Sequence, residues 1–162
     1  MTPLVGTLFV HGLLGAFDTL VFHELVGRLR HDPVRNRREL VLHGGRSCLY
    51  AVVFSLAATG RASSSAVLGL LLVEAPLTAI DVWVEARDRA VRPPVGERVA
   101  HLFMFCTWLG ILAAWWRTPE EPTTTWVRSG LLSALAIGSG VSGAADLVAA
   151  GRGLARVAGG DH

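Results

Sequence analysis

The stretch AFDTLVFHELVGRL, residues 16–29, has the composition of the end of a membrane-spanning helix, yet it contains Asp18, His23 and Glu24. The whole chain is similarly apolar: its 162 residues are 51% hydrophobic and 17% charged, with a mean hydropathy of +0.46. An ordinary soluble domain has about 25% charged residues. The composition therefore predicts an integral membrane protein.

Five apolar segments have about the length that a helix needs to cross the hydrocarbon core, roughly 20 residues. They lie at about 4–28, 39–60, 66–87, 98–117 and 126–150. We predict an all-α bundle of five transmembrane helices that forms a single domain over residues 1–162. The N-terminus has neither a basic region nor a cleavage site, so we expect it to begin the first span and not a removed signal peptide.

Arginine is distributed unequally between the two predicted sides of the membrane. Segments 28–46 and 87–98 and the C-terminal tail hold twelve arginines, whereas the other side holds only three. Short loops rich in arginine are cytoplasmic. The asymmetry predicts a multi-pass protein of the inner (plasma) membrane, with the N-terminus outside and the C-terminus in the cytoplasm. Because no nucleic-acid-binding motif accompanies the basic charge, we exclude nucleic acid as a partner.

Two segments, 11–33 and 74–94, share one polar pattern. They align with Asp18 against Asp81, and each has a second polar residue seven positions earlier, His11 and Glu74. Both segments continue through arginines to a proline. An internal repeat of this kind is typical of two related units packed about a common interface.

The helix after each segment opens with a glutamate followed four residues later by a histidine. These pairs are Glu39 with His43 and Glu97 with His101. Residues four apart lie on one helix face, so the side chains of each pair can meet. We predict that the first four helices form two hairpins related by a pseudo-twofold axis, with the polar groups at their interface.

Carboxylates inside a membrane require a compensating charge. One charged side chain at the bilayer centre costs about 2.5–3.5 kcal/mol, and carboxylates that lie together repel one another. Carboxylates with a few imidazoles suit iron or manganese, and also zinc. We therefore predict a metal site near the cytoplasmic side, with two iron ions favoured and zinc or manganese as alternatives. The predicted ligands are Asp18, His23, Glu24, Glu39, His43, Asp81, Glu85, Glu97 and His101, and the predicted catalytic groups are Glu74 and His11.

The same residues also have a purely structural interpretation. Glu39 and Glu97 lie in first helical turns, where the helix dipole stabilises acidic side chains. His23, Glu24 and Glu85 are near arginines with which they could pair. The histidine that follows each glutamate in both hairpins favours the metal site, because capping a helix does not require it.

The predicted fifth span is rich in small residues at intervals of three and four, including Ala134, Gly138 and Ser142. This pattern is typical of closely packed membrane helices. It predicts a helix that braces the bundle or forms a homodimer face. We expect Asp146, near the cytoplasmic end of this span, to pair with Arg152.

These motifs resemble those of a group of small bacterial polytopic membrane proteins without an assigned activity. The shared pattern is FDT with HE in the first span, ELxLHxxR opening the second, ExxxTxxDxxxE in the third and ERxxH opening the fourth. It covers about residues 11–101. The resemblance implies that these positions act as one constellation, of the kind found in membrane proteins that bind metal through carboxylates and histidines. The two glycines after His43 depart from the pattern and would let another helix or a ligand approach.

The first functional prediction is a membrane metalloenzyme that hydroxylates or desaturates a lipidic or small hydrophobic substrate from the bilayer. A zinc-type hydrolase is the alternative enzyme. A metal or proton transporter is a second class, disfavoured because the outer halves of the second and fourth spans hold almost nothing that could conduct an ion. A third is a non-catalytic membrane subunit.

Overall fold

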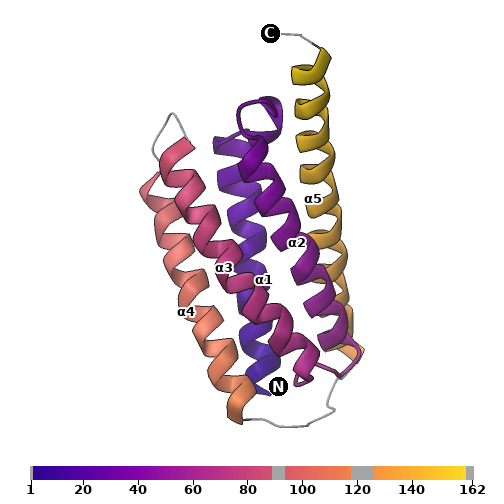
Figure 1. Cartoon of the computed structure of the whole chain (residues 1–162). Helices are drawn as coiled ribbons and strands as arrows, with labels where there is room; N and C mark the ends of the chain where they lie inside the picture. The colour runs from indigo at the N-terminus through magenta and orange to yellow at the C-terminus, as the bar shows by residue number, and fades with distance from the viewer. Residues whose placement is uncertain (1, 89–93, 118–125, 160–162) are drawn as a thin grey trace.

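The computed structural model describes residues 2–88, 94–117 and 126–159, and in these parts of the chain it contains helices and no strand. The long helices are α1 (Pro3–Asp18), α2 (Arg37–Ala58), α3 (Ser65–Asp88), α4 (Val95–Arg117) and α5 (Trp126–Gly159) (Figure 1). Five helical segments are long and apolar enough to cross a membrane, the first of them running through α1 to Val26. The predicted all-α bundle of five such helices is confirmed, and it is compatible with a multi-pass membrane protein.

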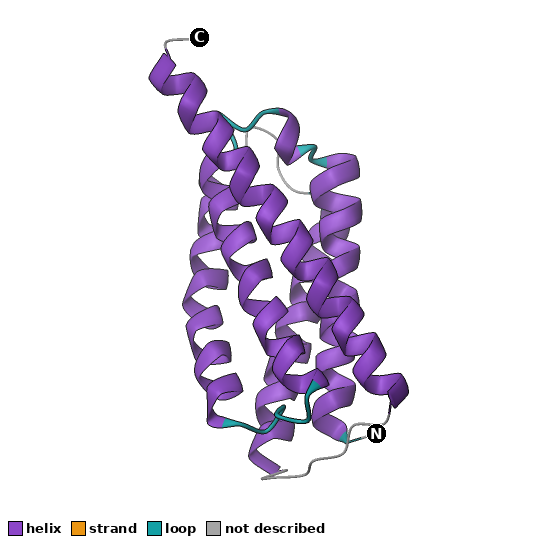
Figure 2. Ribbon diagram, turned by 90° about the vertical axis from the view of Figure 1, so that its right-hand side faces the viewer, coloured by secondary structure: helices purple, strands orange, loops and turns teal. Residues whose placement is uncertain are grey.

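The helices run side by side along one direction, and α5 continues beyond the others at its C-terminal end (Figures 1 and 2). Helix α2 packs along α5 on one side and against α3 on the other, while α1 packs against α4. The predicted fifth span therefore packs within the bundle. Its role as a homodimer face stays a prediction.

The first span is not a continuous α-helix. Thr2 caps its start by accepting a hydrogen bond from the Val5 amide at 3.4 Å, and a proline follows the cap, as is common at helix N-termini. After Asp18 the chain continues as a π-helix, Thr19–Val26, in which hydrogen bonds span five residues instead of four. This segment ends before Arg28, whose φ of 47° is left-handed and turns the chain away.

The contact between α2 and α5 depends on two glycines that face each other, Gly44 and Gly143. A Cβ atom on Gly143 would lie 2.8 Å from both the Gly44 carbonyl oxygen and the Cys48 Sγ. Backbone therefore meets backbone here, which explains one of the two glycines after His43 and shows that the fifth helix packs closely at Gly143. Gly138, one of the predicted packing positions, is instead open, since a Cβ atom on it would meet nothing within 4 Å.

Gly143→Ala is expected to destabilise the protein by about 1–3 kcal/mol, because the added methyl group meets backbone that cannot move aside. Thermal unfolding in detergent would measure the loss. Gly140→Ala is the matched control on the same helix, since its Cβ would lie 3.6 Å from the Ala51 Cβ, an ordinary contact. Equal effects of the two substitutions would contradict the close approach.

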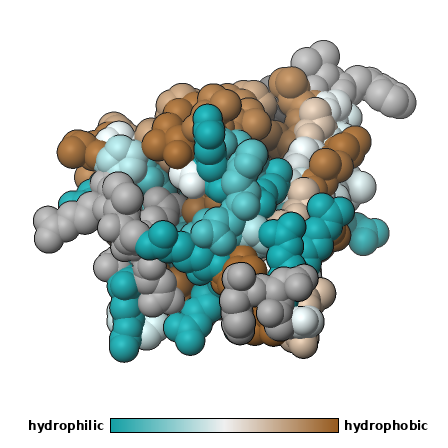
Figure 3. All heavy atoms as spheres, turned by 90° about the horizontal axis from the view of Figure 1, so that it is seen from above, coloured by the Kyte–Doolittle hydropathy of each residue, from teal (hydrophilic) through white to brown (hydrophobic). Residues whose placement is uncertain are grey.

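Polar and apolar residues occupy different parts of the interior. The apolar core gathers where α1 begins and α2 ends, and includes Leu4, Leu8, Val53, Phe54, Val67, Leu71 and Ile111. The buried polar side chains lie from the middle of the bundle toward the other end: His11, Asp18, His23, Glu39, His43, Glu74, Asp81, Glu85, Glu97 and Asp146. Viewed onto that end, hydrophilic side chains gather across it and hydrophobic ones cover a flank (Figure 3).

Candidate metal site

The π-helix brings Asp18 and His23 together. Residues five apart in an α-helix point about 140° away from each other, because each residue turns the helix by about 100°. In a π-helix five residues make little more than one turn, so the two side chains share a face. The Nε2 atom of His23 lies 3.3 Å from Oδ2 of Asp18.

Helix α4 supplies the other half of the site. Glu97 and His101 are four residues apart and project from one face toward α1. Oε1 of Glu97 lies 3.8 Å from Nε2 of His23, and Nε2 of His101 lies 3.5 Å from Oδ1 of Asp18. One ligand atom from each of these four residues lies within 4.8 Å of all the others. We call Asp18, His23, Glu97 and His101 the Asp/His/Glu/His group.

The group could hold a metal ion. Oδ1 of Asp18 is buried and accepts no hydrogen bond from the described residues. The carboxylates are almost fully buried, with 4% of Asp18 and none of Glu97 exposed. Nitrogen and oxygen ligands about 2.0–2.1 Å from a tetrahedral ion are about 3.3–3.4 Å apart, close to the two shortest separations here. Two imidazoles and two carboxylates suit iron, manganese or zinc.

Glu85 lies beside the group without belonging to it. Its Oε2 atom is 3.6 Å from Nδ1 of His101, the ring nitrogen that faces away from Asp18. Metal-binding histidines commonly have a carboxylate at their second nitrogen, which orients the ring. Glu24 instead pairs with Arg30 at 2.9 Å and is only partly buried.

His43 adjoins the group from α2. Its ring stacks on the ring of His23 with centroids 4.3 Å apart. Its Nδ1 lies 2.7 Å from Oδ2 of Asp146, and its Nε2 lies 3.3 Å from Oγ1 of Thr19. Asp146 also accepts a 2.7 Å hydrogen bond from Arg30. The predicted ligand His43 therefore has a carboxylate partner outside the group.

Asp146 pairs with Arg30 and His43, so the predicted pairing with Arg152 is wrong. Glu39 is buried one helical turn before His43, as the predicted Glu–His pair requires. It is not among the four residues whose ligand atoms converge.

The structure places Glu74 and Asp81 around Arg46, apart from the Asp/His/Glu/His group. Nε and Nη2 of Arg46 donate to Oε1 of Glu74 at 3.2 and 3.0 Å, and Nη1 donates to Oδ2 of Asp81 at 2.6 Å. Thr78 also donates to Glu74. Sequence reasoning assigned no charge-pairing role to Arg46, although an arginine in the middle of a span is itself a sign of a buried ion pair.

His11 lies deeper in the bundle. Its Nδ1 is 2.8 Å from Oγ1 of Thr107 on α4, and its ring lies against Tyr50 with centroids 4.9 Å apart. These contacts connect α1 with α4 and α2. They are consistent with a helix-to-helix hydrogen bond, a role that intramembrane histidines often have.

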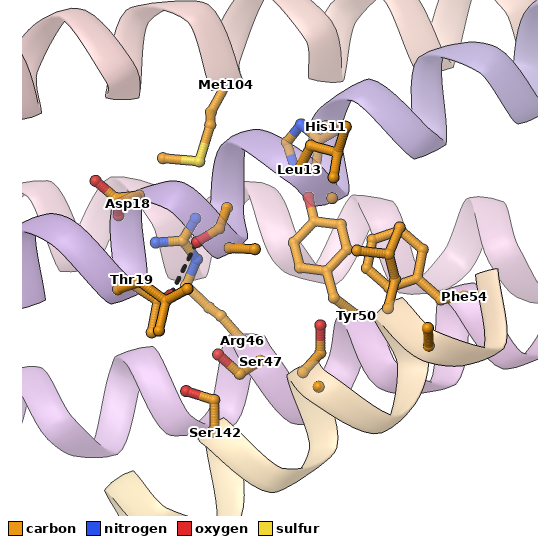
Figure 4. Close-up of a pocket in the computed structure, with 18 of the residues that line it drawn as sticks. His11, Leu13, Asp18, Thr19, Arg46, Ser47, Tyr50, Phe54, Met104 and Ser142 are labelled. Atoms are coloured by element: carbon orange, nitrogen blue, oxygen red, sulfur yellow. Dashed lines mark hydrogen bonds between the residues drawn. The ribbon is translucent and has the colours of Figure 1, made fainter. Parts of the chain in front are cut away.

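Two cavities flank the Asp/His/Glu/His group. One, of about 430 Å³, lies among α1, α2 and α5 and is lined in part by Asp18 (Figure 4). The other, of about 460 Å³, lies between α3 and α4 and is lined in part by His101. His11, Arg46 and Met104 line both cavities and so separate them.

Comparisons with protein-family models, with curated proteins and with solved structures found no match. The resemblance to the group of small bacterial membrane proteins therefore stays a prediction. The fold and the site define the protein only as a bundle of apolar helices with a buried Asp/His/Glu/His group that could hold a metal ion.

Proposed function

We propose that the protein is an integral membrane metalloenzyme that uses iron to hydroxylate or desaturate a lipidic or small hydrophobic substrate. One observation carries the proposal: a buried group of two imidazoles and two carboxylates borders a largely apolar cavity in a bundle of membrane-type helices. Such a site places a reactive ion next to a space suited to a hydrophobic molecule.

The residues of the site would have two roles, binding the ion and orienting its ligands. Asp18, His23, Glu97 and His101 would bind the ion, and Glu85 would hold the His101 ring in orientation. Iron with such ligands and open positions supports reactions with oxygen. In a hydroxylation, one atom of O₂ would enter a C–H bond of the substrate and the other would leave as water, with two electrons and two protons from an external donor.

The number of ligands favours iron over zinc. Four protein ligands would complete a tetrahedral zinc site, and closed zinc sites are structural. Iron accepts more than four ligands, so the same four residues would leave room at the ion for oxygen or substrate. We propose a single ion at the group, because His43 and Asp81, two of the other predicted ligands, have Asp146 and Arg46 as partners.

The arrangement of helices supports the proposed internal repeat and orientation. A twofold axis that relates the two hairpins would exchange α1 with α3 and α2 with α4. A contact between α1 and α4 would then have an equivalent contact between α3 and α2, and both pairs of helices pack together. We place the end of the bundle nearest the group in the cytoplasm, because the arginine-rich segments flank it. The apolar core at the other end disfavours an ion path across the membrane.

Metal content of the purified protein tests the proposal. After reconstitution with Fe(II) in detergent and removal of unbound ions, elemental mass spectrometry is expected to find about one iron per chain. The group offers one set of ligands for one ion. Well-folded protein that binds no metal would refute the enzyme proposal. One zinc, retained in preference to iron, would replace it with a zinc site.

A further inference from the structure

The cavity among α1, α2 and α5 is elongated and changes character along its length. On the first span its lining runs from Phe9 on α1 to Leu20 on the π-helix, a rise of about 16 Å. One end is apolar, with Phe9, Leu13, Phe54, Leu131 and Leu135. The other end is polar, with Asp18, Thr19, His43, Ser47 and Ser142. Figure 4 shows Leu13 and Phe54 at one side of the cavity and Asp18, Thr19 and Ser142 at the other.

The cavity reaches the outer surface of the bundle between α1 and α5. Two of its lining residues, Leu13 and Leu131, are 49% and 47% exposed. Small residues line the space between these helices, and a Cβ atom on Gly15 or on Gly138 would meet nothing within 4 Å. In a membrane, this opening would face the lipid chains.

The charged groups at the polar end already have partners. Asp18 lies beside His23 and His101, His43 beside Asp146, and Arg46 between Glu74 and Asp81. The hydroxyl of Tyr50 is the uncharged polar group of interest here, because it is buried and makes no hydrogen bond with the described residues. Tyr50 is only 8% exposed and lines the cavity. An uncharged polar group could satisfy this hydroxyl without bringing a further charge close to the Asp/His/Glu/His group, whose negative charge the proposed metal ion would neutralise.

We propose that this cavity binds an uncharged single-chain amphiphile from the membrane, of the fatty alcohol or monoacylglycerol class. Its chain would lie between α1 and α5, and its hydroxyl or carbonyl group would contact the hydroxyl of Tyr50, whose ring lies between those of His11 and Phe54 (Figure 4). Identification of this molecule as the substrate rests on the proposed function. Its binding requires only the cavity.

Photolabelling tests the binding site. A fatty alcohol with a diazirine in its chain would be added to purified protein, and labelled peptides would be mapped by mass spectrometry. Saturable labelling is expected on α1 and α5 at the lining residues. Gly138→Leu, which fills the cavity, is expected to reduce it roughly tenfold, equivalent to about 1.4 kcal/mol. Gly151→Leu is the matched control, because this α5 glycine is equally open and does not line the cavity.

Competition tests the uncharged polar group. Unlabelled fatty alcohol is expected to displace the probe better than a fatty acid or a fatty amine of equal length. Tyr50→Phe is expected to weaken displacement by the alcohol severalfold and to leave displacement by the plain hydrocarbon unchanged. Equal labelling of the Gly138→Leu and Gly151→Leu variants, or preference for a charged competitor, would overturn the proposal.

The labelling is to be repeated on protein stripped of metal by a chelator. Saturable labelling of the stripped protein would support the lipid site whether or not the protein binds iron. If the same protein also failed to bind iron on reconstitution, the proposed enzyme alone would be refuted. Iron binding without saturable labelling would refute the lipid site alone.

Discussion

His101→Ala is expected to lower the affinity for iron by at least about 100-fold, whereas His43→Ala should leave it within about tenfold. The loss of a residue that merely orients a ligand costs about 10–100-fold, and His101 is itself one of the four converging residues. His43 only stacks on the group and pairs with Asp146. Titration with iron against a chelator of known affinity would measure both variants.

The two variants control for each other. Each removes a histidine four residues after a glutamate, in the second turn of an apolar helix. An equal and severe loss in both would indicate the two-ion twofold site that the repeat predicts. Full iron binding by a folded His101→Ala protein would exclude the Asp/His/Glu/His group as the site.

The membrane spans were predictable because a helix in lipid must be long and almost wholly apolar. The predicted and observed bounds mostly differ by a few residues, and the exceptions have physical reasons. The first span changes to a π-helix at Thr19, and α5 runs beyond its apolar part to Gly159. Neither feature changes the apolar pattern on which the prediction depended.

The site was predictable only in part. The Glu97–His101 pair followed from α-helical spacing, and its residues do lie together. The pairing of Asp18 with His23 did not follow, because five residues in an α-helix point the side chains apart. A change of hydrogen-bond register in the backbone brings them together, and the sequence has no simple signal for it.

The two aligned segments differ at one position, and this difference determines which partners the buried carboxylates have. Aligning Glu39 with Glu97 places Arg46 against Met104. Where α2 packs on α3, the arginine neutralises two carboxylates. Where α1 packs on α4, methionine stands in its place, and the carboxylate of Asp18 meets two imidazoles instead. At α1 and α4 the aligned position therefore supplies no arginine to the carboxylates, and a metal ion could neutralise them.

Arg46→Met, which makes the two copies alike at this position, is expected to destabilise the protein by about 3–5 kcal/mol. The substitution keeps an unbranched side chain of related length but leaves Glu74 and Asp81 buried without a counter-charge, the most costly way to break a buried ion pair. Unfolding in detergent would measure the loss. A chelator should be present so that no metal ion replaces the guanidinium group.

The triple variant Arg46→Met, Glu74→Gln, Asp81→Asn is expected to regain most of this stability, because it removes the two charges together with their partner. The recovery distinguishes a charge effect from loss of packing around the Arg46 side chain, which the triple variant does not restore. A triple variant no more stable than Arg46→Met would mean that the arginine stabilises the bundle by its contacts. The charges of Glu74 and Asp81 would then not explain why one copy of the repeat has an arginine where the other has a methionine.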